Sequence, residues 1–314
     1  MPGSFPPPPR AGGTPPGRNR GRHKGAGMLP FAQVILDGLF TGSTYALMAA
    51  GLALILGVVK VVNLSHGAFF SLGAYVAYVL SAKGVSNPAA AVLLACVIAF
   101  AFGVFLGKSF INPVRSHPFS VAVGSLGFAI LFEQAAQMLW GPHPVSIGSG
   151  PPWGELSGVV VRRWGAVSLL ASAGILGGLA LFLSSRWGLP LKLISEEEEI
   201  AGSVGIDVEK IRYLTFGFAS ATAAAAGALL APATSITPTM GRVPLILSLI
   251  VVIASGMENV LAIFLLAVGL GLLSNISAYL LAPQWSYVSL LTVISLVLLL
   301  RPAGLSATDP GRDY

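Results

Sequence analysis

The chain has 314 residues, of which 54% are hydrophobic and only 10% are charged, and its mean hydropathy is +0.81. Soluble globular domains carry about 25% charged residues, so the composition excludes an ordinary soluble protein and predicts an all-α polytopic membrane protein. A single cysteine, Cys96, excludes a disulfide framework, and the four histidines are scattered without the spacing of metal ligands.

The N-terminal segment differs in character from the rest of the chain. Residues 1–27 are rich in Pro, Gly and Arg, hold five of the 18 Lys and Arg, and contain no acid. They include no apolar run, so they cannot be a signal peptide and do not fold alone. Two interpretations stay open: a disordered basic tail that touches anionic lipid, or a start codon assigned in error, with translation beginning at Met28. We therefore divide the chain into this tail, a membrane domain over 28–305 and a short tail over 306–314.

Apolar stretches follow one another from residue 32 to residue 300. A membrane helix needs ~20 apolar residues, with a range of ~17–25. By this criterion the chain is a helical bundle with eight or nine membrane segments, because the stretch over 243–257 is short enough to be re-entrant or broken. The candidate segments are 32–57, 66–82, 88–107, 119–140, 166–185, 213–235, 243–257, 259–281 and 285–300.

The distribution of Lys and Arg in the loops predicts the orientation. If all nine segments span the membrane, the loops on one side carry nine Lys and Arg and those on the other side carry four. The side with more basic residues is cytoplasmic, which places the C-terminus inside and Met28 outside. The Arg-rich tail favours the opposite placement of the N-terminus, and this conflict disappears if translation starts at Met28.

Three of the apolar stretches are rich in small residues, namely 38–57, 216–233 and 266–281. Small side chains allow helix backbones to approach closely in a membrane, where no hydrophobic effect drives helices together. These stretches predict a tightly packed bundle.

The segment "NLSHG" places three polar side chains, Asn63, Ser65 and His66, inside an apolar region. Each polar group costs free energy if it stays unpaired in a membrane or a core. One interpretation is a helix cap, in which Asn63 or Ser65 accepts from free N–H groups at the start of the second segment. The other is a polar cluster that lines a cytoplasm-facing translocation path or a subunit joint. The two interpretations are compatible.

Other polar residues within the apolar stretches are few. Glu133 is the only acid well inside a predicted span, and such groups usually face the bundle interior. It lies about two turns from the end of its span, so an interfacial carboxylate is the alternative to a place on the translocation path. Asp37 is expected at the outer interface, and Asn275 is expected to form a hydrogen bond to a neighbouring helix.

The long polar loop from Ser184 to Phe216 is the candidate for contact with a partner. Ser195 and Glu198 have capping-box spacing, so Ser195 is predicted to start a short amphipathic helix that Gly205 ends. A solvated charged loop is the usual interpretation of such a run, but an isolated amphipathic helix on the cytoplasmic side is better explained as a docking element. Its predicted apolar face consists of Ile200, Val204 and Ile206.

Several stretches together resemble the permease subunits of branched-chain amino-acid ABC transporters, of the LivH type. Asn63, His66 and Gly67 match the Asn-Phe-Ala-His-Gly motif of that family, with Leu64 and Ser65 as variants. The resemblance runs from about residue 31 to residue 305 in the family's order. The matching stretches are "GLFTGSTYALMAAGLALILGVVKVVNLSHGAFFSLGAYVAY", "NPVRSHPFSVAVGSLGFAILFEQ", "AGSVGIDVEKIRYLTFGFASATAAAAGALLAP" and "VLLLRPAGL".

The resemblance implies a multi-pass permease in the plasma (inner) membrane of a bacterium or archaeon, surrounded by membrane lipid. It implies four partners: a second homologous permease, two cytoplasmic ATP-binding subunits and an extracytoplasmic solute-binding protein. The docking loop would be 195–210, with Glu199, Ala201, Gly205 and Ile206 at the best-matching positions. The chain has no G-x-x-x-x-G-K-[ST] phosphate loop, so ATP hydrolysis must come from a partner. We expect no catalytic residue, metal, cofactor or nucleic acid.

The chain departs from the family's pattern at three places. The Gly-rich turn expected after the seventh segment is replaced by Gly256 alone, with Glu258 and Asn259 following. A basic residue expected near Leu189 is missing, and four consecutive acids occupy 196–199. The first departure bears on the solute, and the other two bear on the identity of the ATPase.

The resemblance predicts ATP-driven alternating access with leucine, isoleucine and valine as solutes. Urea, short amides or other amino acids are the alternative solutes within the family. A stand-alone secondary transporter or channel would need more intramembrane acids than Glu133 to couple ions. A membrane enzyme is disfavoured, because no nucleophile, base or metal set converges in the sequence.

Overall fold

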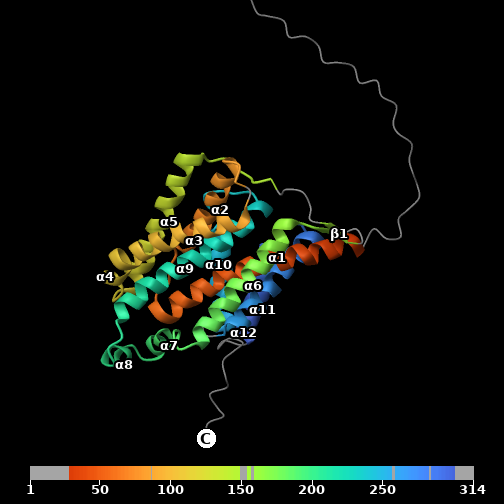
Figure 1. The fold of residues 1–314 in the computed structure, drawn as a ribbon. Coiled ribbons are helices and arrows are strands. Elements are labelled where there is room, and N and C mark those ends of the chain that lie inside the picture. The colour runs from red at the N-terminus through yellow and green to blue at the C-terminus, as the bar shows by residue number, and fades with distance from the viewer. Residues whose placement is uncertain are drawn as a thin grey trace, which may run out of the picture.

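The computed structural model describes residues 28–85, 87–148, 154–156, 159–256, 259–282 and 284–300, which form a helical bundle (Figure 1). The predicted tails 1–27 and 306–314 lie outside the described residues. Each of the nine predicted apolar segments coincides with a helix. The elements are α1 (Met28–Leu54), η1 (Ile55–Val59), α2 (His66–Ala82), α3 (Pro88–Leu106), η2 (Gly107–Ile111), α4 (Asn112–Val114), α5 (Pro118–Trp140), β1 (Gly154–Leu156), β2 (Val159–Val161), α6 (Arg163–Ser184), α7 (Leu189–Glu196), α8 (Glu198–Ser203), α9 (Val208–Leu230), η3 (Ala231–Ala233), α10 (Arg242–Ser255), α11 (Val260–Leu280) and α12 (Trp285–Leu300).

Six helical stretches of the described chain are long and apolar enough to cross a membrane. They contain α1, α3, α5, α6, α9 and α11, which confirms an all-α polytopic membrane bundle. The helices α2 and α10 are apolar but shorter. Between α5 and α6 in the sequence, β1 pairs antiparallel with β2 and aligns Gly154 with Val161.

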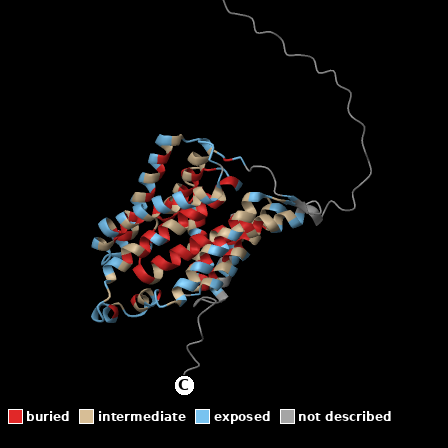
Figure 2. Ribbon diagram, viewed as in Figure 1, coloured by how far each residue is buried: buried red, intermediate tan, exposed pale blue. Residues whose placement is uncertain are grey.

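Helices α1 and α9 form the centre of the bundle. Their spanning windows are 78% and 72% buried, whereas the other four spans are 17–28% buried and turn apolar side chains outwards. Buried residues accordingly gather in the middle of the bundle (Figure 2). The outer helices have the lipid-facing character expected of a membrane protein.

Close backbone contacts hold this centre together, as the small residues predict. A Cβ atom added to Gly227 of α9 would lie 1.8 Å from the carbonyl oxygen of Phe70 in α2. One added to Gly271 of α11 would lie 2.4 Å from Cα of Gly42 in α1. No side chain fits at either position, so glycine is required for these helices to approach.

Polar side chains define where several helices begin. Asn87, Asp207 and Asn259 cap α3, α9 and α11, each accepting a backbone N–H bond at 3.0 Å. Such caps satisfy N–H groups that have no partner inside the helix. Asn259, one of the departures from the family's Gly-rich turn, therefore has a structural role, while Glu258 lies outside the described residues.

Helices α2 and α10 begin inside the bundle rather than at its ends. The imidazole Nε2 of His66, the first residue of α2, lies 3.1 Å from the carbonyl oxygen of Met48. Met48 lies six residues, or about 9 Å at 1.5 Å per residue, before the end of α1, and the π-helical turn η1 continues the helix beyond that point. His66 therefore contacts α1 well before its end. A Cβ atom on Gly241, just before α10, would lie 1.9 Å from the carbonyl oxygen of Gly67. The two short helices thus start side by side in the interior.

Candidate functional site

The start of α2 is organised around the side chain of Asn63. Its Oδ1 accepts from the backbone N–H of Ser65 at 3.0 Å and from the Ser65 hydroxyl at 2.6 Å. Asn63 thus satisfies the N–H of Ser65, the residue just before α2, but no described side chain caps the first turn of α2 itself, so the cap interpretation holds only for the turn that precedes the helix. The same interpretation is wrong for Ser65, whose hydroxyl donates to Asn63 and caps nothing.

The side chain of His66 is buried beside this turn. Its Nε2 lies 3.1 Å from the Met48 carbonyl, which can only accept, so Nε2 donates and Nδ1 is left as an acceptor. Within the described residues, neither Nδ1 of His66 nor Nδ2 of Asn63 has a hydrogen-bond partner, and both residues are 0% exposed. An unpaired buried polar atom costs free energy, so this cluster holds one acceptor and one donor available to another group.

Helix α5 holds the segment that precedes α2. The backbone N–H of Leu64 donates to the hydroxyl of Ser125 at 3.0 Å, and that hydroxyl donates to the carbonyl of Ala122 at 2.9 Å. The cluster of Asn63 and His66 is therefore fixed between α1 and α5.

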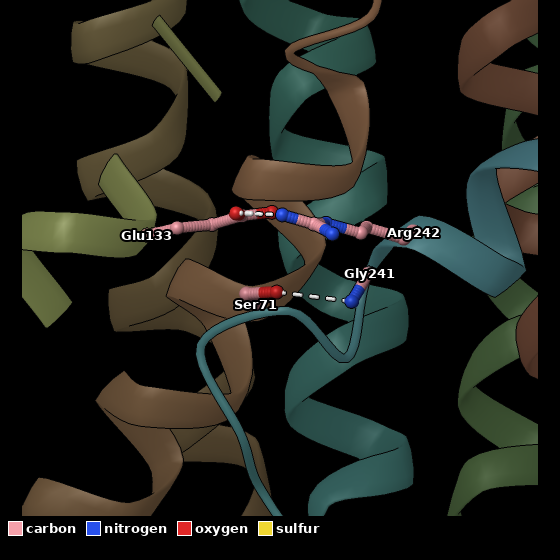
Figure 3. Close-up of polar contacts among 4 residues, drawn as sticks. All are labelled: Ser71, Glu133, Gly241 and Arg242. Atoms are coloured by element: carbon pink, nitrogen blue, oxygen red, sulfur yellow. Dashed lines mark hydrogen bonds and ion pairs between the residues drawn. The ribbon is translucent and has the colours of Figure 1, made fainter. Parts of the chain in front are cut away.

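Glu133 of α5 lies buried and forms an ion pair with Arg242, the first residue of α10 (Figure 3). Arg242 Nε donates to Glu133 Oε1 at 2.8 Å, and Nη2 donates to Oε2, so the pair is bidentate. Glu133 is 6% exposed, whereas the side chain of Arg242 is 63% exposed, so the pair lies at the edge of the buried interior and a place for Glu133 on the translocation path stays a prediction. Its charge is already paired, which argues against Glu133 as an ion-coupling group.

The backbone before α10 is held by the same neighbours. The N–H of Gly241 donates to the hydroxyl of Ser71 in α2 at 3.1 Å, next to the Glu133–Arg242 pair (Figure 3). Together with the close contact between Gly67 and Gly241, these bonds fix the start of α10 to α2 and α5. We call this group of contacts, made by Ser71, Glu133, Gly241 and Arg242, the α10 junction.

The polar loop folds into two short helices at the far end of the bundle from β1 (Figure 1). The prediction that Ser195 starts one helix is wrong: Ser195 lies in the last turn of α7, and its hydroxyl donates to the Lys192 carbonyl at 2.7 Å. The break falls at Glu197, which has an extended backbone and precedes α8. Ser195 follows an apolar turn that extends α7 past the expected boundary.

Gly205 ends α8 as predicted, with φ of +86°. Its N–H donates to Gly202 at 3.1 Å, and the N–H of Ile206 donates to Ala201 at 3.1 Å. This pair of bonds is the Schellman motif, whose left-handed residue strongly favours glycine.

The predicted apolar face of α8 is only partly correct. Ala201 is 0% exposed and packs in a small cluster with Val58 and Ile194, to which Ile206 also turns. Ile200 and Val204 are 52% and 63% exposed and point away from this cluster. The buried face attaches α8 to the bundle, and the face of Ile200 and Val204 is open.

Glu198 ties α8 to the neighbouring helices. It forms ion pairs with Arg212 of α9 and, at 3.2 Å, with Arg115. Partial burial acts to raise the pKa of the Glu198 carboxyl, but the hydrogen bonds and charges of Arg212 and Arg115 outweigh it and hold that pKa below its usual value. One of the four consecutive acids is thus structural, whereas Glu197 and Glu199 are exposed.

Asn275 does not form the predicted hydrogen bond to a neighbouring helix. Its Nδ2 donates at 3.0 Å to the carbonyl of Gly271, one turn earlier in its own helix α11. Asn275 and the half-buried Asp37 both line a cavity of about 230 Å³ between α1, α6, α9 and α11.

Residues 34–300 match a family described as "Branched-chain amino acid transport system / permease component". The match covers five of the six spanning helices in full and α1 from residue 34 onwards. The chain belongs to this family. It is a permease subunit of an ABC importer and a multi-pass integral protein of the inner membrane.

Curated relatives agree with this assignment. The permease is 26% identical to the high-affinity branched-chain amino acid transport system permease protein BraD of Pseudomonas aeruginosa, over 88% of this chain and 95% of that protein. It is equally identical to the LivH permease proteins of Salmonella typhimurium and Escherichia coli K12, over 88% of this chain and 96% of each. The solved structure of PsaBC from Streptococcus pneumoniae in complex with Fab gives a TM-score of 0.48 at 13% identity, covering 85% of this chain and 91% of that chain.

Sequence reasoning missed the basic partners in the permease. Arg242 and Arg212 entered only as loop charges, yet they pair with Glu133 and Glu198. The available signal was that each lies at the first or second turn of an apolar helix, where a cation needs a nearby anion.

Proposed function

We propose that this permease subunit carries leucine, isoleucine and valine across the membrane. The observation that carries the proposal is the family match over residues 34–300, together with relatives named for branched-chain amino acids. Urea, short amides and other amino acids remain the alternative solutes.

The proposed complex contains a second homologous permease, two cytoplasmic ATP-binding subunits and an extracytoplasmic solute-binding protein. The docking element is α8, including Glu199, with Ser195 and the end of α7 beside it. The exposed face of Ile200 and Val204 supports this proposal, because these apolar side chains are 52% and 63% exposed and a partner groove would cover them. Gly205 fixes how that face is presented.

We infer nine membrane segments, with α2 and α10 as short helices that begin inside the bundle. Helices interrupted at mid-depth are typical of transporters, where irregular backbone is tolerated if protein or a cavity lines it. This count places α7 and α8 in the cytoplasm and the start of α1 outside, in agreement with the loop charges.

The translocation path is proposed to pass the polar cluster at the start of α2. The unpaired Nδ1 of His66 and Nδ2 of Asn63 support this, because they offer an acceptor and a donor within an apolar interior. Ser65 orients Asn63, and Glu133 positions α10 beside the cluster through Arg242. Closure of the ATP-binding subunits would move α8 and tilt the bundle about this point.

The test is uptake by proteoliposomes that contain the complete complex. With ATP and the solute-binding protein present, radiolabelled L-leucine should accumulate and urea should not. Accumulation of urea or a short amide instead of leucine would support the alternative solutes. Leucine uptake that needs no ATPase subunit would overturn the assignment of this permease to ATP-driven import.

A further inference from the structure

The cavity at the outer end of the permease is lined by both charged and apolar residues. Its volume is about 230 Å³, and it lies among α1, α6, the end of α9 and α11. Phe40, Trp164 and Leu229 contribute apolar surface. Ligand pockets usually measure ~300–1,000 Å³, so a cavity of this size suits a solute smaller than a drug molecule.

Two opposite charges line this cavity without neutralising each other. Asp37 of α1 and Arg162, which follows β2, both belong to its lining. Among the residues that the structure describes, Arg162 has no ion pair or side-chain hydrogen bond, and the Asp37 carboxylate accepts one bond, from Gln33 Nε2 at 3.1 Å. A carboxylate and a guanidinium held apart in one cavity complement the ammonium and carboxylate of a zwitterion.

Gln33 links the two elements that carry these charges. Its Oε1 accepts from the backbone N–H of Val160 in β2 at 3.0 Å, while its Nε2 donates to Asp37. One side chain therefore attaches the strand pair, and with it the backbone two residues before Arg162, to α1 beside Asp37.

Asn275 supplies a further polar group. Because its Nδ2 donates to Gly271, its orientation is set and its side-chain oxygen is left as an acceptor. Asp37 and Asn275 thus offer acceptors for an ammonium group, and Arg162 offers donors for a carboxylate.

We propose that this cavity binds the free ammonium and carboxylate groups of a small α-amino acid, with the apolar side chain against Phe40 and Leu229. The inference rests on the proposed function in amino-acid transport and names a site distinct from the Asn63–His66 cluster. Apolar packing would disfavour a charged ligand side chain.

The test is binding of radiolabelled L-leucine to the assembled complex of permeases and ATP-binding subunits in nanodiscs, without the solute-binding protein. Leucine amide lacks the carboxylate and N-acetyl-leucine lacks the ammonium, so each should compete on the order of tenfold or more weakly than leucine. Asp37→Asn and Arg162→Gln should each weaken leucine binding by a similar factor. Arg163→Gln is the matched control, because Arg163 is the exposed neighbour of Arg162 and does not line the cavity.

The outcomes separate this site from the proposed function. Equal competition by the two analogues, or wild-type binding in both cavity variants, overturns the site even if leucine is transported. Leucine uptake by proteoliposomes without measurable binding to the nanodisc complex also overturns the site and leaves the proposed function standing. Specific binding that depends on Asp37 and Arg162, without uptake of leucine, supports the site and overturns the proposed solute.

Discussion

Replacing Ile200 and Val204 of α8 together by Ser should detach the ATP-binding subunit while leaving the permease folded. The two side chains are 52% and 63% exposed, so half to two-thirds of each is available for burial against a partner. Full burial of such a side chain is worth ~1.5–3 kcal/mol, so the pair should contribute about 1.5–3 kcal/mol to docking. This corresponds to a Kd for the ATP-binding subunit that is raised ~10- to 150-fold.

The assay is titration of the ATP-binding subunit onto the permease in nanodiscs, with thermal unfolding measured on the same samples. Leu189→Ser is the matched control, since Leu189 is 63% exposed and belongs to α7 rather than α8. The double variant should lose affinity with an unchanged unfolding temperature, and the control should keep both. If the double variant binds and supports uptake like the wild type, α8 is an ordinary solvated connection and the docking argument fails.

Four further perturbations test the other contacts. Gly205→Val places a β-branched residue at φ +86°, which costs at least ~1–2 kcal/mol, so docking should weaken in the same titration; wild-type affinity would contradict this. Arg242→Gln strands the buried Glu133 carboxylate and should lower the unfolding temperature more than Glu133→Gln, which leaves an exposed cation; the reverse order would refute the α10 junction. His66→Leu should reduce uptake more than the amount of protein in the membrane, and normal uptake would remove the cluster from the translocation path. Glu198→Gln should lower the unfolding temperature at neutral pH, because it leaves the buried guanidinium of Arg212 without its anionic partner. The pKa of the Glu198 carboxyl is lowered in the folded protein, so the stabilisation by Glu198 is lost as the pH falls through that lowered pKa. The difference in unfolding temperature between Glu198→Gln and the wild type should therefore shrink on acidification. A constant difference would contradict the ion pair.

Helix positions could be predicted from the sequence because apolar length decides them. The nine apolar stretches correspond to nine helices, and Gly205 adopts the backbone conformation that its position at a helix end predicts. Both signals are local: one depends on the length of an apolar run, and the other on a conformation that side chains other than glycine rarely adopt.

The depth at which α2 and α10 begin could not be predicted in this way. It depends on contacts between residues far apart in the chain, such as Gly67 with Gly241 and His66 with Met48. The ion pair between Glu133 and Arg242 joins two helices across 109 positions of the sequence. Hydropathy gives the length of each segment and carries no information about which partner fixes its ends.

The packing of α8 shows a second limit. Ile200, Val204 and Ile206 were expected to share one apolar face, yet Ile206 packs with the fully buried Ala201 and Ile200 is exposed. Ile200 and Ala201 are adjacent and lie about 100° apart around the helix, so they belong to different faces. In a helix of six residues each face carries few apolar groups, and the sequence alone does not decide which face is buried. Ala201 is buried through tertiary packing with Val58 and Ile194, residues that lie in other elements of the chain.

The contacts of α9 explain how movement of α8 can reach the polar cluster at the start of α2. Near the start of α9, the buried Arg212 forms an ion pair with Glu198 of α8. Four turns later, Gly227 contacts the backbone of Phe70 in α2, four residues after His66. A continuous helix with buried contacts at both ends transmits displacement with little bending, because packed interiors are stiff. Because no side chain fits between Gly227 and Phe70, Gly227→Ala should push α9 away from α2, so the uptake per ATP hydrolysed should fall while the ATP-binding subunit still docks at α8. Unchanged uptake per ATP would contradict this route.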